Sequence, residues 1–311
     1  MTPATETPTY YDQWGPLARR VLLAGHFCRF IAKTSFGVGP RILVEINWRL
    51  GDEIMALPIY EALKKRHPAA QVDVLCNYPE LLDDNPYVDA VNPVTPSVDR
   101  YYLLRGAPRD AYRVEHYAQQ ADVPVPDARP ALYYKDWDSP LLDELAPGDA
   151  PVVAVAAGAS WETKRWPKER WRALCDRITE SGSRLMVLGQ GEDESLGIGT
   201  DYVGRTSVRE AATLLHRADV LVSNDSGLMH LSLAAGTPVV ALFGPTDPAI
   251  LIRNEARLHA LENERACAGC WNGSQRMREP GVCPLDVDSC MGPITVERVE
   301  AKIDEVLSGR G

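Results

Sequence analysis

A short helix, predicted over 227–235, follows the N-cap residue Ser226 and begins with Gly227 and Leu228, directly after an apolar run at 219–223. Such a run is typical of a strand buried in a parallel sheet. Ligands of open α/β sheets lie at the carboxyl ends of the strands, and a helix N-terminus placed there offers unpaired N–H groups and about half a positive charge. These residues therefore predict a phosphate site.

Two side chains border the start of this helix. Asp225, just before the cap, is placed to accept hydrogen bonds from hydroxyl groups. His230 lies one turn inside the helix and on the same face as the cap, because residues i and i+4 share a face. An imidazole there either contacts the phosphate or packs in a Rossmann-like core, and both interpretations stay open.

Two cations, Lys164 and Arg165, stand just before a helix whose first turn is marked by Pro167. Two cations at a helix start oppose the helix dipole, so a purely structural explanation is awkward, whereas an anionic ligand removes the conflict. The neighbouring indoles of Trp166 and Trp171 are more typical of a core.

Weaker signals lie on two further loops. Gly189 and Gln190 follow a predicted strand at 184–188, where a glycine turn on its own says little. Thr246, within the run GPTDP, either lines a ligand pocket or belongs to a turn bounded by prolines.

One carboxylate, Asp52, stands at the carboxyl end of the first predicted strand, 41–46, where a helix predicted over 53–66 begins. An aspartate in that place commonly serves as a helix cap. A general base needs the same group at the ligand-binding edge of a sheet. Position alone does not choose between these two roles.

Four cysteines fall within a short segment: Cys267, Cys270, Cys283 and Cys290. The first two form a C-x2-C motif, and the set fits a tetrahedral four-thiolate site for structural zinc or iron. The spacing lacks the second C-x2-C of a zinc ribbon. Unligated or reversibly oxidised thiols therefore stay open as the alternative.

The run DSGLMHLSLAAGTPVVALFGPTDP, which starts at Asp225, resembles the signature of glycosyltransferase family 9, the ADP-heptose:lipopolysaccharide heptosyltransferases. Other parts resemble the family as well, namely RLGD at Asp52, NPYVDAV, and TKRWP at Lys164. The resemblance begins near Arg41. It implies an α/β GT-B fold, with two Rossmann-like domains facing across a cleft, and inverting, metal-independent transfer of a heptose-like sugar from a nucleotide diphosphate.

The resemblance also implies roles for individual residues. Asp52 matches the proposed general base, and Lys164 matches the cation of the diphosphate-binding segment, which leaves Arg165 as a solvated neighbour. The implied donor-binding residues are Lys164, Asp225, Ser226, Gly227, Leu228, His230, Gly189, Gln190 and Thr246. No cofactor is implied for catalysis, and the implied partners are ADP-heptose and a saccharide or glycolipid acceptor such as the lipopolysaccharide core.

A chain of 311 residues suits two domains. Alternating strand and helix patterns predict a parallel sheet in each. We expect residues 1–40 to form an extension with a basic amphipathic helix, residues 41–148 to form the acceptor domain, and residues 149–311 to form the donor domain. The helix of the extension either lies on a membrane or docks on the protein itself.

The net charge of −10 disfavours binding to nucleic acid. No run reaches the roughly 18 apolar residues of a membrane span. The start of the chain is acidic and lacks the pattern of a signal peptide, and seven cysteines in such a chain indicate reduced thiols. We expect a cytoplasmic protein, either free or peripheral at the inner face of the membrane.

Two other functions fit parts of the sequence. An NDP-sugar epimerase shares the implied fold and turns over the donor without an acceptor. An interaction module built on the four cysteines predicts stoichiometric metal and no nucleotide binding.

Overall fold

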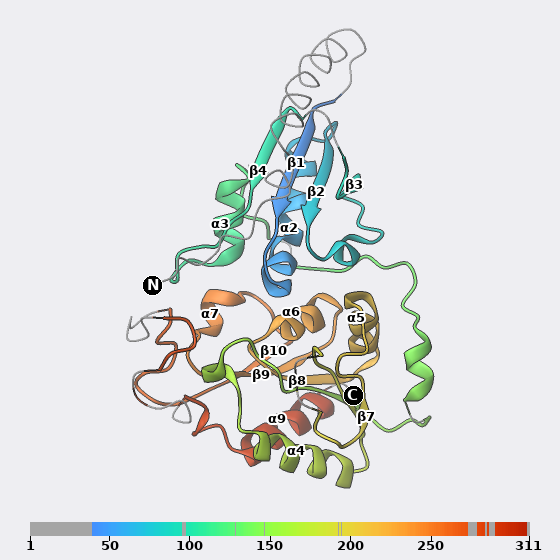
Figure 1. Ribbon diagram of the computed structural model, residues 1–311, viewed down its shortest axis with the longest axis vertical. Coiled ribbons are helices and arrows are strands. Elements are labelled where there is room, and N and C mark those ends of the chain that lie inside the picture. Colours follow the sequence, from blue (N-terminus) through green and yellow to red (C-terminus); the bar gives the residue numbers. More distant parts are fainter. Residues whose placement is uncertain are drawn as a thin grey trace.

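The computed structural model describes residues 39–94, 98–127, 129–145, 147–191, 193, 195–272, 279–283, 285 and 290–309. These residues form two lobes, each built on a parallel sheet, stacked along the long axis of the molecule (Figure 1). The predicted amphipathic helix of the extension lies outside the described residues. In the described part of the chain, no helix has both the length and the apolar character needed to cross a membrane.

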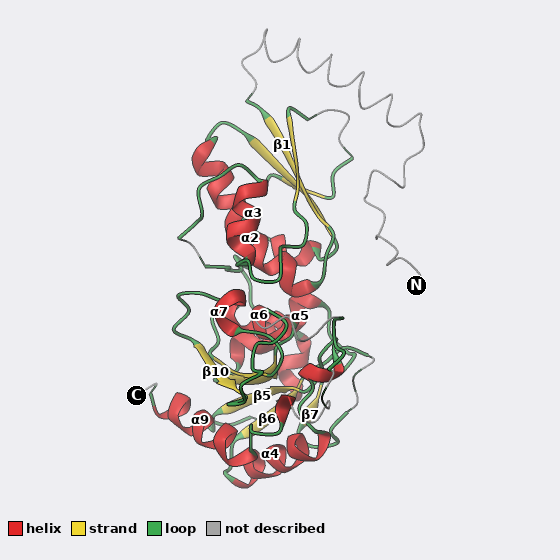
Figure 2. Ribbon diagram, turned by 90° about the vertical axis from the view of Figure 1, so that its left-hand side faces the viewer, coloured by secondary structure: helices red, strands yellow, loops and turns green. Residues whose placement is uncertain are grey.

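The first lobe holds a sheet of four strands in the order β3-β2-β1-β4. The strands are β1 (Arg41–Ile46), β2 (Gln71–Cys76), β3 (Ala90–Val91) and β4 (Arg100–Leu103). Helices α2 (Leu50–Arg66) and α3 (Arg113–Gln120) cover one face of this sheet (Figure 2). The single-turn helix η2 (Pro79–Leu82) follows β2.

The second lobe holds a sheet of six strands in the order β10-β9-β8-β5-β6-β7. The strands are β5 (Val152–Ala156), β6 (Arg184–Val187), β7 (Thr200–Asp201), β8 (Val220–Asn224), β9 (Val239–Phe243) and β10 (Leu258–Glu262). On the side of the first lobe lie α5 (Val208–Arg217), α6 (Gly227–Ala234) and α7 (Pro248–Leu251), and on the far side lie α4 (Lys168–Glu180) and α9 (Val296–Ser308) (Figure 1).

The strongest sequence patterns agree with the structure. The helix predicted from Ser226 runs over Gly227–Ala234, and it is followed by Gly236, whose φ of 96° suits a helix end. Helix α2 begins at Leu50, three residues earlier than predicted, so that Asp52 lies inside its first turn. The early start follows from the burial of Leu50 between the lobes, which a sequence pattern does not reveal.

The order of the strands places two loops at the centre of the molecule. In each parallel sheet the order of the strands reverses at one point, between β1 and β4 in the first lobe and between β5 and β8 in the second. Such switch points are where open α/β sheets bind ligands. The loop after β1 leads into Asp52 on the first turn of α2, and the loop after β8 carries Ser226; both residues lie at the boundary between the lobes.

The lobes contact each other directly where α2 meets α6. A Cβ atom added at Gly227 would lie 3.1 Å from the Leu50 side chain, and one added at Gly51 would lie 2.9 Å from the His230 ring. Near strand β7, the short helix η3 (Pro140–Glu144) is bound to the second lobe, because Tyr202 Oη donates to the Leu141 carbonyl at 2.9 Å. The segment before residue 148 is therefore already attached to the second sheet.

Candidate active site

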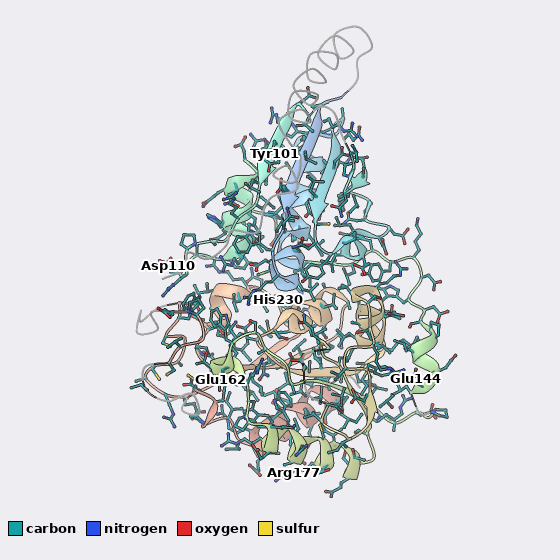
Figure 3. The ribbon with its side chains drawn as sticks, in the orientation of Figure 1. Tyr101, Asp110, Glu144, Glu162, Arg177 and His230 are labelled. Carbon is teal, nitrogen blue, oxygen red and sulfur yellow. The ribbon has the colours of Figure 1, made fainter. Side chains whose placement is uncertain are left out.

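Two adjoining cavities lie at the boundary of the lobes, around the start of α6. One has a volume of about 320 Å³ and is lined by Asp52 from the first lobe and by Lys164 and Asp225 from the second. The other, of about 540 Å³, is lined by the loops at Gly158 and Gly189. Ser226 and Gly227 border both cavities, and His230, labelled in Figure 3, lies close to the centre of the boundary.

The cation and the carboxylate predicted beside the phosphate site are bound to each other. The short helix η4 (Glu162–Lys164) brings Lys164 to α6, where its Nζ lies 2.6 Å from Oδ2 of Asp225. Thr246 Oγ1 donates to the same oxygen at 2.6 Å. Burial raises the pKa of Asp225, but the Lys164 charge and the two hydrogen bonds outweigh burial and hold that pKa below its usual value. Asp225 is therefore ionised and paired.

Ser226 occupies the N-cap position of α6, but its side chain makes no capping hydrogen bond. Its Oγ lies instead 3.1 Å from Oγ of Ser223, whose hydroxyl donates to the Asn224 carbonyl at 2.7 Å. This corrects the predicted role of the Ser226 hydroxyl. The uncapped start of α6, at Gly227 and Leu228, borders the cavities and suits an anion.

The structure also changes the reason for Gly227. The sequence assigns this glycine to close contact with a ligand, whereas a side chain there would first meet Leu50 of α2. Gly227 thus permits the two lobes to approach, and its N–H remains at the helix start.

Asp52 faces the second lobe from the first turn of α2. Its Oδ1 accepts a hydrogen bond from Tyr117 Oη at 3.2 Å and lies 3.5 Å from Nε of Arg113. The Asp52 side chain keeps 20% of its surface exposed, and the residue lines the smaller cavity. A carboxylate that is oriented by two donors and still accessible is suited to accept a proton.

His230 lies at the contact of the two lobes and is buried. Burial lowers its pKa, and the Lys164 charge adds to this effect, while the charges of Asp225 and Asp52 oppose it. The ring is therefore neutral at pH 7. His230 borders the cavity and also packs beside Gly51, so both roles left open by the sequence are compatible with its position.

Gly189 and Gln190 lie in the wall of the larger cavity, which Thr206 and Ser207 also line. Asp193 braces this loop, since its Oδ2 accepts a hydrogen bond from the Gln190 N–H at 2.8 Å. These weaker candidates are thus placed together with Leu228, which lines the same cavity.

Other predictions concern the residues around Lys164. Arg165 is exposed, as expected of a solvated neighbour, and its Nε also donates to the Ala159 carbonyl at 2.9 Å. Trp166 and Trp171 are buried in the core of the second lobe, as predicted.

Sequence reasoning missed several residues of the smaller cavity. They are Trp48, Arg109, Arg113, Trp161, Trp271 and Asn272. Arg109 lies with its guanidinium 3.6 Å from the ring centre of Trp271, and Asn272 Nδ2 donates to the Arg109 carbonyl at 2.5 Å. Trp48 and Trp161 could have been identified from the sequence, because they lie close to Asp52 and Lys164, respectively.

The four clustered cysteines are present as thiols. Burial raises the pKa of Cys290 to about 12, and the neighbouring Cys283 thiol adds to the rise, followed by Cys270 and Cys267. The thiols therefore gather in space. Within the described ranges, no group of three or more histidine, cysteine, aspartate or glutamate side chains is arranged to hold a metal ion.

The C-x2-C turn is bound to the loop that carries Thr246. The N–H groups of Gly269 and Trp271 donate to the carbonyls of Gly244 and Pro245 at 3.2 and 2.8 Å. The cysteine cluster therefore supports one wall of the smaller cavity.

Residues 94–279 match the family model described as glycosyltransferase family 9 (heptosyltransferase). Lipopolysaccharide heptosyltransferase 1 of Pseudomonas aeruginosa is 33% identical over 163 residues, which are 50% of this chain and 44% of the relative. The chain spans between a third and about half of the length of the curated relatives it matches first.

Solved structures share the fold. The ADP-heptose lps heptosyltransferase II of E. coli has a TM-score of 0.69 at 20% identity, over 87% of this chain and 99% of that one. The iron-containing dodecameric glycosyltransferase TibC of enterotoxigenic E. coli H10407 has a TM-score of 0.71 at 18% identity, over 88% and 77%. The predicted α/β fold of the GT-B type is confirmed.

Proposed function

Because the chain belongs to glycosyltransferase family 9, we propose that it is an inverting heptosyltransferase that uses ADP-heptose and a saccharide or glycolipid acceptor such as the lipopolysaccharide core. One observation carries the proposal: a carboxylate of one lobe and a cation at a helix start of the other line the same cavity of about 320 Å³. We also propose an acceptor domain, 41–148, and a donor domain, 149–311, with the η3 segment of the acceptor domain docked on the second lobe.

The acceptor side of the reaction is assigned to Asp52. Its carboxylate takes the proton of an acceptor hydroxyl, and the acceptor oxygen then forms a bond to the anomeric carbon of heptose. The bond from that carbon to the phosphate oxygen breaks on the opposite side, so the anomeric configuration inverts. Tyr117 and Arg113 hold Oδ1 of Asp52 and thereby orient the base.

The departing ADP takes the bonding electrons and gains negative charge. Lys164 and the N–H groups at the start of α6 are the groups that stabilise this charge. Asp225 holds the ammonium of Lys164 in position through the ion pair, and Thr246 orients Asp225. Because these protein groups meet the charge of the diphosphate, the proposed reaction needs no metal ion.

The nucleoside is assigned to the larger cavity. Its volume of about 540 Å³ lies beside the start of α6, and Gly189 and Gln190 are among the residues that line it. ADP bound there directs its diphosphate to the cation in the smaller cavity.

We also propose a structural zinc or iron site formed by Cys267, Cys270, Cys283 and Cys290. Thiolates are preferred ligands of both metals, and the four thiols gather on one side of the donor pocket. This site takes no part in the transfer step. We further propose that the enzyme works in the cytoplasm, at the inner face of the membrane, where residues 1–40 provide the contact.

The decisive experiment compares Asp52→Asn with Asp110→Asn. Asp110 is an exposed carboxylate of the same lobe, labelled in Figure 3. We expect Asp52→Asn to lower kcat about 10²–10⁴-fold and to leave the Kd for ADP unchanged, because the shape of the side chain is kept. Asp110→Asn should retain full activity. An Asp52→Asn enzyme with more than about a third of the wild-type kcat would overturn the assignment.

An acceptor-free assay separates the rival function. Epimerisation of ADP-heptose by the wild-type protein in the absence of any acceptor would favour an epimerase over a transferase.

A further inference from the structure

We propose that the indole of Trp48 is a stacking platform for a sugar ring of the acceptor, and that Glu53 and Asn77 are positioning residues that hold it. The proposal rests on the proposed function, because it assumes a saccharide acceptor that approaches Asp52. Neither the sequence patterns nor the transfer mechanism assigns a role to these three residues.

Trp48 is exposed in a place where an indole can be used. It keeps 42% of its surface exposed, whereas Trp166 and Trp171 keep 2% and 1%. It lines the same cavity as Asp52, which lies four positions later, on the first turn of α2. Large exposed aromatic side chains that line a cavity typically provide contact area for a ligand.

The backbone of Trp48 is fixed at both of its polar groups. Its N–H donates to Oε1 of Glu53 at 3.3 Å, and its carbonyl accepts from Nδ2 of Asn77 at 3.0 Å. A residue that is bound at both ends loses little further freedom when its side chain meets a ligand, so binding is favoured by preorganisation. The exposure of the indole is therefore combined with a rigid attachment.

Glu53 joins the two loops that produce this attachment. It is 2% exposed, and besides Trp48 it accepts the N–H groups of Asn77 and Tyr78 at 2.9 and 3.0 Å. One buried carboxylate thus ties the loop after β1 to the loop after β2. The loop after β1 is the segment that leads into Asp52.

The neighbouring loop, at Gly106, lies against the edge of the indole and supports it. A Cβ atom at Gly106 would lie 3.6 Å from the Trp48 ring, and Arg113 Nη1 holds this loop by donating to the Ala107 carbonyl at 2.9 Å. Arg113 also contacts Asp52, so the platform and the base share one support.

The positions of Trp48 and Asp52 indicate that the sugar ring on Trp48 belongs to the acceptor. Trp48 and Asp52 belong to the first lobe, whereas Lys164 and α6, which are assigned to the diphosphate, belong to the second. A sugar ring presents a face of C–H groups that can lie on an indole while its hydroxyls remain outside the ring plane. Such a ring on Trp48 places a hydroxyl within the cavity that Asp52 lines.

The experiment measures acceptor and donor separately in Trp48→Ala, Trp48→Phe and Glu53→Gln. The probes are ADP-heptose with a deacylated, heptose-free lipopolysaccharide core oligosaccharide for kinetics, and ADP for calorimetry. Tyr101→Ala is the matched control, because Tyr101 is also 42% exposed but lies on β4, away from the cavity (Figure 3). Thermal unfolding verifies that each variant is folded.

We expect Trp48→Ala to raise the acceptor KM about tenfold, which corresponds to about 1.4 kcal/mol, and to leave the Kd for ADP within about twofold. Trp48→Phe should retain most of the affinity because a ring remains. Glu53→Gln should raise the acceptor KM with the ADP Kd unchanged, which a loss of stability alone would not do. If Trp48→Ala leaves the acceptor KM unchanged, or weakens ADP binding by the same factor, the proposal that Trp48 binds the acceptor is wrong.

Failure of the proposed function gives a different result. A wild-type protein that binds ADP but transfers no heptose to this acceptor contradicts the transferase assignment. Direct binding of the oligosaccharide, followed by saturation-transfer NMR in the presence of ADP, then tests the platform alone. Equal signals from the wild type and Trp48→Ala would reject it.

Discussion

Lys164 and Asp225 form an ion pair at the start of α6, with 2.6 Å between Nζ and Oδ2 and with only 12% and 5% of their side-chain surfaces exposed. The pair holds a cation at the proposed diphosphate site before any ligand arrives. It also makes each partner dependent on the other, because a buried charge without its partner is costly.

Lys164→Met is expected to weaken ADP binding and to destabilise the protein, since Asp225 loses its cation. The loss of stability should be about 3–5 kcal/mol, the usual result of breaking a buried pair. The double variant Lys164→Met/Asp225→Asn should recover stability but not ADP affinity. Urea unfolding and calorimetry with ADP measure the two quantities. Recovery of ADP affinity in the double variant would show that Lys164 does not contact the diphosphate.

This pairing shows what the sequence could not reveal. The apolar run at 219–223 and the cap at Ser226 were sufficient to place β8 and α6, because burial and helix initiation leave local patterns. The partners of Lys164 were not predictable, since η4 and the loop before α6 meet only through the arrangement of the sheet. A match to a family motif identified both residues but did not indicate that they bind each other.

Gly227→Ala tests whether this glycine serves the lobe contact or the ligand. The new methyl group would lie 3.1 Å from Leu50, which is tighter than normal packing, so we expect a loss of stability of about 1–3 kcal/mol. If this clash also weakens ADP binding in Gly227→Ala, shortening the opposing side chain in Gly227→Ala/Leu50→Ala should restore it. If ADP binding stays weak in the double variant, the methyl group acts on the ligand directly.

The sequence patterns did not reveal the edge strands β4 and β10. Both are partly exposed and carry polar residues, so they lack the continuous apolar run that marks a central parallel strand. The pocket residues Trp48 and Trp271 escaped notice because a tryptophan in a sequence is more often part of a core.

The cysteine cluster predicts a measurable metal content. Protein purified without a metal-affinity tag should contain about one zinc or iron per chain by elemental analysis, and replacement of Cys267 or Cys290 by serine should remove it. Cys175→Ser is the control, because Cys175 is a buried thiol of the second lobe that is not one of the four clustered cysteines. Metal-free protein that is folded and active would favour unligated thiols.

Glu53 predicts a specific dependence of stability on pH. Burial raises its pKa from an ordinary 4.5 to about 7, although hydrogen bonds from the N–H groups of Asn77, Tyr78 and Trp48 act in the opposite direction, and the charge of Asp52 adds to the rise. The other ionisable groups around it are Tyr60, Cys76 and Tyr117, whose pKa values burial raises as well. Apart from the charged Asp52, Glu53 therefore titrates among groups that stay neutral.

Between pH 4.5 and about 7 the folded protein keeps the Glu53 proton that the unfolded chain releases. The stability gained from this carboxyl is fully present below pH 4.5 and is lost as the pH rises to about 7, a change of about 3 kcal/mol. Glu53→Gln cannot titrate, so the unfolding free energy of the wild type minus that of Glu53→Gln should fall over this window and stay constant above it. Urea unfolding at pH 5, 6, 7 and 8 measures this difference, with Glu61→Gln on the outer face of α2 as the control. A difference that does not change with pH would mean that Glu53 is ionised throughout.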